Sequence, residues 1–149
     1  MKQTANKILL FSFMCAIYLA SCGLISERET KVKIESDNFP VFHITGSGTL
    51  GDFVIFGPKQ RDIGSDRNFA VWEIMPINGY LRGQRVEEIN SIRYGEVPKG
   101  YEQIYPENNA PPPSLLPEKK YEYWFQTINA GHARGFFEIR NGKAMEVAR

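Results

Sequence analysis

The side chains best suited to covalent chemistry in this 149-residue chain are two thiols, those of Cys15 and Cys22. Cys22 directly follows Leu19-Ala20-Ser21, which places two small side chains just before the cysteine. Cys15 follows the bulky Met14 and lacks that setting. The thiolate form of cysteine is a strong nucleophile and can be modified covalently. Cys22 is therefore the first candidate site.

The segment before Cys22 has the layout of a secretory signal. Lys2 and Lys7 give it a basic start with no acidic residue, and residues 8–20 are almost wholly apolar. A basic start, a short apolar stretch and small residues at its end are typical of a signal peptide. A membrane-spanning helix needs roughly 20 apolar residues, so this stretch is too short to span. The sequence therefore predicts export.

Together, Leu19-Ala20-Ser21-Cys22 resembles the lipobox of bacterial lipoproteins. The resemblance implies cleavage between Ser21 and Cys22 and a diacylglyceryl group on the Cys22 sulfur; beyond this covalent lipid, no cofactor is expected. Two or more acyl chains hold a protein stably on a membrane. Residue 23 is Gly and not Asp, which favours the outer membrane if the host is Gram-negative. An uncleaved anchor and a plain signal peptide remain the alternatives.

Charge and cysteine content limit the partners and the means of stabilisation. Removal of residues 1–21 takes away two lysines and no acid, which leaves 16 basic and 17 acidic residues and a net charge of −1. A nucleic-acid binder needs a basic patch or stripe, so this balance argues against nucleic acid as a partner. Cys22 is the one cysteine after the signal, and no intrachain disulfide is expected.

The chain divides into three parts. Residues 1–21 are predicted to be the signal peptide, residues 22–38 the lipidated cysteine and a flexible tether, and residues 39–149 a folded domain. The tether is assigned because it has too few large apolar residues to form a core. The alternation of Val32 and Ile34 could add a short edge strand within it.

Short β-type runs separated by turn residues fill the predicted domain. We expect strands near residues 41–45, 52–56, 69–74, 91–94, 101–105, 121–128, 136–139 and 143–147. Asn141-Gly142 predicts a type I′ hairpin turn between the last two. Residues 86–89 fit a helical turn or a strand, and the proline run at 111–113 predicts an extended connection. Strands of this length and spacing indicate a sandwich or a barrel.

One pattern favours the sandwich. Leu115 and Pro117 precede Tyr121 at spacings similar to those before strand F of fibronectin type III domains, and the pattern covers roughly a quarter of the chain. Trp72 followed by Pro76 resembles, loosely, the Trp-bearing strand B of that family. The resemblance implies a single antiparallel β-sandwich in which Tyr121 forms a tyrosine corner, its hydroxyl bonded to backbone a few residues upstream. Glu118 replaces the glycine that usually follows the proline.

Other chemical motifs lack the context that they need. The glycines of 46–51 match G-x-G-x-x-G, but a strand pattern follows where a dinucleotide site needs a helix, so no nucleotide is expected. His43 and His132 have no zinc-site spacing; we expect a structural His43, a solvated His132 and no metal. No G-x-S-x-G elbow occurs, and no catalytic residue is predicted.

The surplus of aromatic residues offers one binding candidate. Alternation from Tyr121 puts Trp124 on the opposite face of its strand, between the polar residues Glu122 and Gln126. Such a Trp could anchor a partner or a sugar ring, or it could simply pack beneath side chains of a neighbouring strand.

Three functions remain open. The first is a non-catalytic, membrane-anchored envelope lipoprotein that binds a protein or a wall component through a face of the sandwich. The second is a hydrolase of envelope polymers that uses a carboxylate pair not yet placed. The third is a structural spacer.

Replacing Cys22 by Ser should abolish incorporation of radiolabelled palmitate and leave unprocessed precursor, because the hydroxyl cannot replace the thiol as lipid acceptor. The measurement is autoradiography of the immunoprecipitated chain, with Cys15→Ser as the matched control that keeps the label. Labelling that survives Cys22→Ser would rule out this lipid site.

Overall fold

The computed structural model describes residues 29–36, 39–58 and 70–148. The predicted signal peptide and Cys22 therefore lie outside the described residues. Among the residues that the structure describes, no helix is long and apolar enough to cross a membrane.

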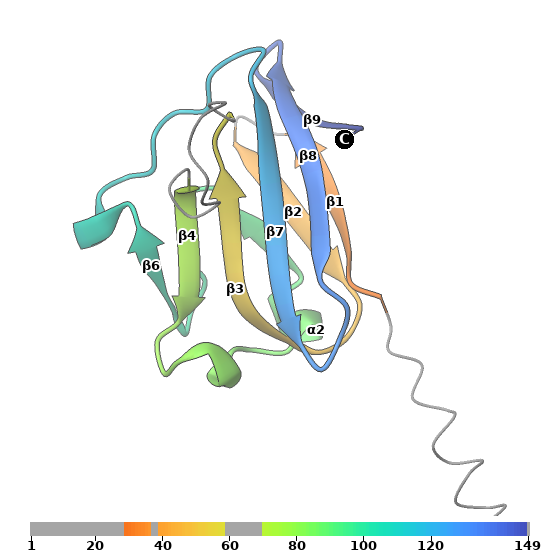
Figure 1. Cartoon of the computed structure of the whole chain (residues 1–149), viewed down its shortest axis with the longest axis vertical. Helices are drawn as coiled ribbons and strands as arrows, with labels where there is room; N and C mark the ends of the chain where they lie inside the picture. Colours follow the sequence, from red (N-terminus) through yellow and green to blue (C-terminus); the bar gives the residue numbers. More distant parts are fainter. Residues whose placement is uncertain (1–28, 37–38, 59–69, 149) are drawn as a thin grey trace, which may run out of the picture.

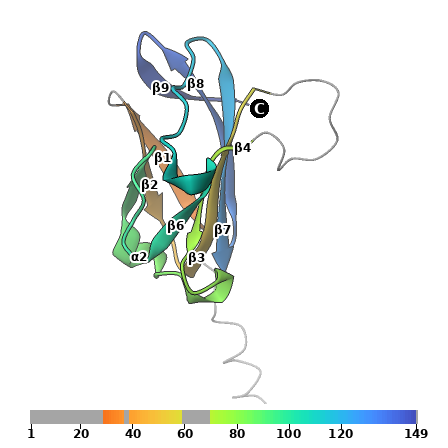
Figure 2. The same ribbon diagram turned by 90° about the vertical axis from the view of Figure 1, so that its left-hand side faces the viewer.

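The described chain is an all-β sandwich of two antiparallel sheets, as the sequence predicts (Figures 1 and 2). The smaller sheet has the order β1-β2-β5, with β1 at Lys31–Ser36, β2 at Pro40–Thr45 and β5 at Ser91–Arg93. The larger has the order β6-β4-β3-β7-β8-β9, with bounds Tyr101–Tyr105, Ala70–Pro76, Thr49–Phe56, Lys120–Ile128, Ala133–Arg140 and Lys143–Val147. Short helical turns are η2 (Tyr80–Arg82), α2 (Val86–Ile89) and η3 (Glu107–Asn109).

The division of strands between the sheets follows that of immunoglobulin-type sandwiches, in which A, B and E oppose C, F and G. Strands β1, β2 and β5 occupy the A, B and E places, and β3, β7 and β8 occupy the C, F and G places. Strand β4 extends the larger sheet beside β3, and β6 and β9 form its two edges.

The core lies between the sheets and is largely aromatic. Phe42 projects from β2 of the smaller sheet, and its ring lies 5.0 Å from that of Phe53 and 5.7 Å from that of Phe137 in the larger sheet. Phe53 on β3 and Phe125 on β7 stack with ring centroids 3.9 Å apart. All four rings are fully buried. Period-two alternation accounts for their placement, since alternate residues of a strand share a face.

Tyr121, the second residue of β7, has the geometry of a tyrosine corner. Its side chain is buried, and its hydroxyl accepts a hydrogen bond from the N–H of Leu116 at 2.8 Å. Leu115 packs against the core, while Pro117 is exposed in the preceding turn. Glu118 has φ 57°, a left-handed conformation that glycine adopts more easily than glutamate.

The Asn141-Gly142 hairpin has the predicted form. The two residues have φ 52° and 74°, and Arg140 pairs with Lys143 across the turn. Both positive φ values are what a type I′ turn requires. Residues 86–89 adopt the helical turn α2 and not a strand.

Two sequence interpretations need correction. Residues 31–36, assigned to the tether, form β1 and pair with β2 along its length, so the sandwich begins before Phe39 and the edge-strand alternative holds. The alternating charged residues Lys31, Lys33 and Glu35 concealed this strand, because only one of its faces is apolar. Trp72 lies on β4 of the larger sheet and not on the strand in the B position.

Replacing Tyr121 by Phe should lower the free energy of unfolding by about 1–3 kcal/mol, because the Leu116 N–H loses its partner. The Tyr121 hydroxyl is the acceptor in this bond, and phenylalanine has no group to replace it. Chemical denaturation measures the change. Tyr105→Phe, on the edge strand β6 and 45% exposed, is the control and should stay within about 0.5 kcal/mol of the parent. Equal effects of both changes would contradict a special role for the corner.

Candidate functional site

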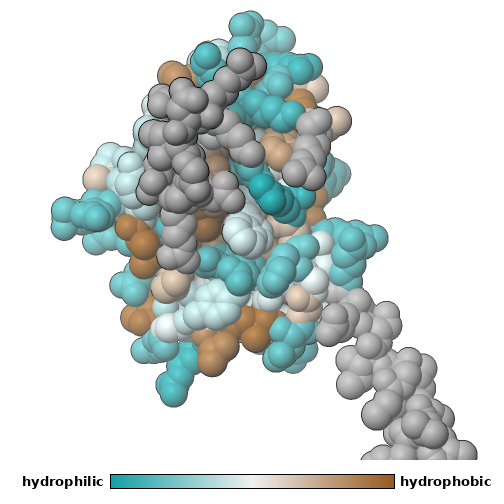
Figure 3. Space-filling view, in the orientation of Figure 1, coloured by the Kyte–Doolittle hydropathy of each residue, from teal (hydrophilic) through white to brown (hydrophobic). Residues whose placement is uncertain are grey.

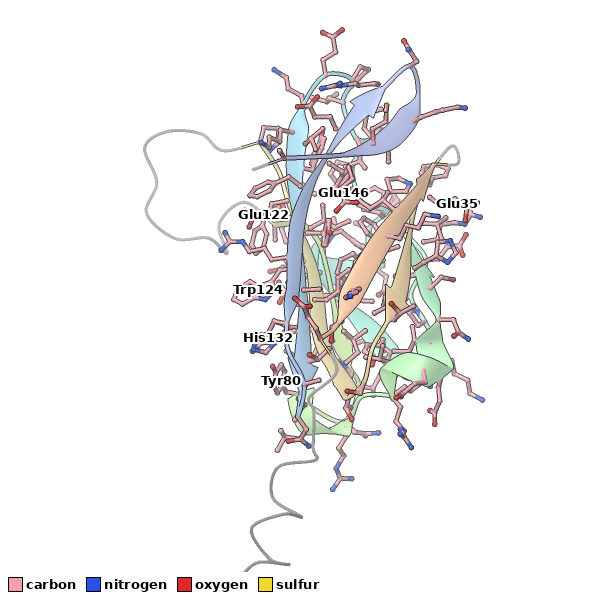
Figure 4. All side chains as sticks on the ribbon, turned by 90° about the vertical axis from the view of Figure 1, so that its right-hand side faces the viewer. Glu35, Tyr80, Glu122, Trp124, His132 and Glu146 are labelled. Carbon is pink, nitrogen blue, oxygen red and sulfur yellow. The ribbon has the colours of Figure 1, made fainter. Side chains whose placement is uncertain are left out.

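The candidate site is the outer face of the larger sheet, centred on Trp124. Tyr123 and Phe125 point into the core, so Glu122, Trp124 and Gln126 take the opposite face, as the alternation predicts. Figure 4 shows Glu122, Trp124, His132 and Tyr80 on this same side of the molecule. The register places Trp124 between Val54 on β3 and Arg134 on β8.

Trp124 is half-buried and packs against a second, smaller apolar cluster. Val54, Phe56 and Ala70 are each buried, and Trp124 contacts them from β7. The cluster depends on an irregularity in pairing, because the register shifts between Ile55 and Phe56 and lets Ala70 reach the outer face while Trp72 stays in the core. Trp124 is thus neither isolated on the surface nor part of the main core.

Acidic side chains surround this outer cluster. Glu122 is 7% exposed and forms an ion pair with Arg134, whose side chain is 48% exposed. Asp52 and Glu73 are also buried and lie on the same face, because their strand neighbours Phe53 and Ile74 point inward. The ion pair matters most, since a buried carboxylate is stable only when a counter-charge or hydrogen bonds satisfy it.

Tyr80 from η2 completes the lower part of the face. Burial and the negative charge of Asp52 raise the pKa of the Tyr80 hydroxyl, and a hydrogen bond with Gln126 partly lowers it. The ring rests on Gly51, where any Cβ would collide with it. Gly51 is the last glycine of the G-x-G-x-x-G match, so this position serves a contact that the motif does not reveal.

The rest of that glycine motif is a turn between strands. Gly46 and Gly48 have φ 137° and 92°, and β3 begins at Thr49 without a helix. A Cβ on Gly48 would lie 2.7 Å from the carbonyl oxygen of Ile128 in the β7–β8 hairpin. The motif therefore brings two turns together and does not open the helix that a dinucleotide site requires.

The two histidines lie on different sheets. His43 projects from the outer face of the smaller sheet, where its Nε2 lies 2.6 Å from Glu35. His132 is exposed, and its Nδ1 accepts a hydrogen bond from the Thr127 N–H at 3.1 Å. In residues 29–36, 39–58 and 70–148, no group of three or more His, Cys, Asp or Glu side chains is placed to hold a metal ion.

Two surface hollows lie away from Trp124's apolar contacts. One, of about 270 Å³, is lined by residues 134–136 of β8 and residues 146–147 of β9. The other, of about 320 Å³, lies between Phe39, residues 93–96 and the proline run. Each has a single carboxylate in its lining, Glu146 or Glu96, and so neither brings together the carboxylate pair that the hydrolase hypothesis needs.

Comparison of the chain with known proteins identifies no relative. No family model, no curated protein and no solved structure matches this chain.

Replacing Trp124 by Ala should lower the free energy of unfolding by about 2 kcal/mol, roughly half the cost for a fully buried aromatic residue, because its packing on Val54 and Phe56 is lost. Thermal and chemical denaturation measure the change, with Trp124→Phe as the conservative control. A loss below about 0.5 kcal/mol for the alanine variant would contradict the packed position.

Proposed function

We propose that this chain is a membrane-anchored lipoprotein of the cell envelope that binds a protein or wall component without catalysis. The observation that carries the proposal is the half-buried Trp124, set in an apolar cluster and bordered by charged side chains. Binding surfaces commonly combine an apolar, aromatic centre with a polar rim, and Trp is enriched among the residues that dominate their affinity.

The polar groups around Trp124 support binding over chemistry. Arg134 engages Glu122, and Gln126 engages Tyr80, so these side chains hold one another in place. A preorganised rim of this kind loses little side-chain freedom when a partner docks. The Arg134 side chain, 48% exposed, also places a positively charged group at the edge of the cluster.

The anchor supports the same function by concentrating the domain at a surface. Cys22 precedes Glu29, the first described residue, by seven positions, and a chain of that length reaches at most about 25 Å. Attachment to a membrane makes encounters with other envelope components nearly intramolecular, so even a modest surface can bind effectively. In a Gram-negative host, the Gly after Cys22 favours the outer membrane as the site.

Site-specific photo-crosslinking in the native envelope tests the proposal. A benzoylphenylalanine at position 124 retains an aromatic group in the cluster, and the same residue at Ser91 samples the outer face of the opposite sheet. We expect discrete adducts from position 124 and none from position 91. Protease sensitivity of an adduct identifies a protein partner, and muramidase sensitivity identifies the wall.

Two outcomes would overturn the proposed surface. The first is the absence of adducts from position 124 in a chain that is exported and folded. The second is an equal or stronger yield from position 91, which would move the binding face to the smaller sheet.

A further inference from the structure

The described chain begins at one end of the sandwich, which we call the proximal end. Glu29 lies against two turns there: a Cβ on Gly46 would lie 3.0 Å from the Glu29 carbonyl oxygen, and one on Gly131 would lie 3.9 Å from the Glu29 Cα. The next residue, Thr30, is buried, with its hydroxyl 3.5 Å from that of Thr127. Packing therefore fixes Glu29 and Thr30 at this end of the sandwich.

The segment between β4 and β5 covers the same end. The N–H of Leu50 donates to the carbonyl of Gln84, and the N–H of Val86 donates to that of Gly48. These bonds tie the segment between η2 and α2 to the start of β3 and to the turn before it, which contacts Glu29. In Figure 1, η2 and the β7–β8 hairpin form the lower tip of the described chain.

Two large apolar side chains are exposed on this tip. Leu81 of η2 is 76% exposed, more than any other large apolar residue described, and Ile77 just before η2 is 56% exposed. Figure 3 shows brown, apolar atoms at the lower tip. Arg82 follows Leu81 within the same turn, so a cation stands beside the apolar pair.

A lipid surface fits this combination. Exposed aliphatic side chains can enter the boundary between headgroups and acyl chains, while an adjacent guanidinium binds the phosphates. The seven-residue limit on the distance from Cys22 to Glu29 keeps the proximal end within about 25 Å of the acyl chains. The attachment makes the contact intramolecular, and two side chains that could not hold a free protein on a membrane suffice to orient a tethered one.

We propose that the proximal end rests on the bilayer, with Ile77 and Leu81 inserted at the headgroup level and Arg82 on lipid phosphate. The inference rests on the proposed lipid anchor at Cys22. It adds an orientation: the long axis of the sandwich is roughly perpendicular to the membrane, and the Trp124 face is roughly perpendicular to the membrane plane.

Nitroxide accessibility in the lipidated mature chain tests this orientation. Acylation occupies the Cys22 thiol, so Leu81→Cys provides the one free thiol for a spin label. Leu116→Cys is the matched control, because Leu116 is 55% exposed and precedes β7 at the opposite end of the sandwich. Both proteins are reconstituted in vesicles of phosphatidylethanolamine and phosphatidylglycerol. Collision rates with oxygen, which concentrates in lipid, and with a water-soluble nickel chelate are then measured.

We expect the ratio of oxygen to nickel collisions at position 81 to exceed that at position 116 several-fold. Adding Ile77→Asp to the Leu81→Cys chain should lower the ratio toward the control value, because a carboxylate resists entry into the headgroup boundary. Equal ratios at positions 81 and 116 would overturn the inference. So would a label at 81 that is shielded from both reagents, which indicates contact with protein.

Mass spectrometry of the same samples separates this inference from the proposal beneath it. An acylated Cys22 with equal ratios overturns the orientation alone. A chain without the acyl mass overturns the anchor and the orientation together, and leaves the Trp124 surface to be judged by crosslinking.

Discussion

Phe42 makes the contact on which the sandwich depends. It is the residue of the smaller sheet whose ring meets those of Phe53, Tyr123, Phe125 and Phe137 in the larger sheet, at centroid separations of 5.0 to 6.0 Å. No disulfide can link the sheets, because the sequence after residue 22 contains no cysteine. The sheets are therefore held by packing, and aromatic side chains bury more area per residue than any other kind. Trp72 of β4 and Tyr94, the residue after β5, make a second aromatic contact, with ring centroids 5.5 Å apart.

The outer surface follows from this inner packing. Once Phe53 and Phe125 stack in the core, the residues beside them, Val54 and Trp124, must face outward, because a strand reverses its faces at every residue. A slip of one residue would exchange the two sets, so the core fixes the register and the register fixes the candidate site. The position of Trp124 therefore depends on the core packing around Phe42 as well as on the alternation of its own strand.

The sequence revealed the features that are encoded locally. Alternating apolar residues located the strands, Asn141-Gly142 located its turn, and the spacing before Tyr121 pointed to a sandwich like that of fibronectin type III domains. Those signals need only a few neighbouring residues. Strand β1 was assigned to the tether because an edge strand with one apolar face lacks the hydrophobic density of its neighbours.

Features that depend on distant parts of the chain were out of reach. The placement of β6 beside β4 cannot be read from residues 101–105, because strand pairing leaves no mark in a strand's own alternation. The packing of the Tyr80 ring on Gly51 joins residues 29 positions apart. The contact of Ala70 with the Trp124 cluster needs the irregular pairing at Ile55 and Phe56. A list of aromatic residues could nominate Trp124, but only the folded sheet shows what surrounds it.

Strand β7 also sets the distance of Trp124 from the proximal end. It runs from the corner at Tyr121 to the hairpin at the proximal end, and its outer side chains recur at intervals of about 7 Å. Trp124 stands four residues, or about 13 Å, along the strand from Ile128. With the proposed anchor alone, a contact at Trp124 is confined to a layer within about 40 Å of the bilayer. Any partner must present its own binding surface inside that layer. The length of the chain between Cys22 and the sandwich therefore limits which envelope components can reach Trp124, whatever their affinity for it.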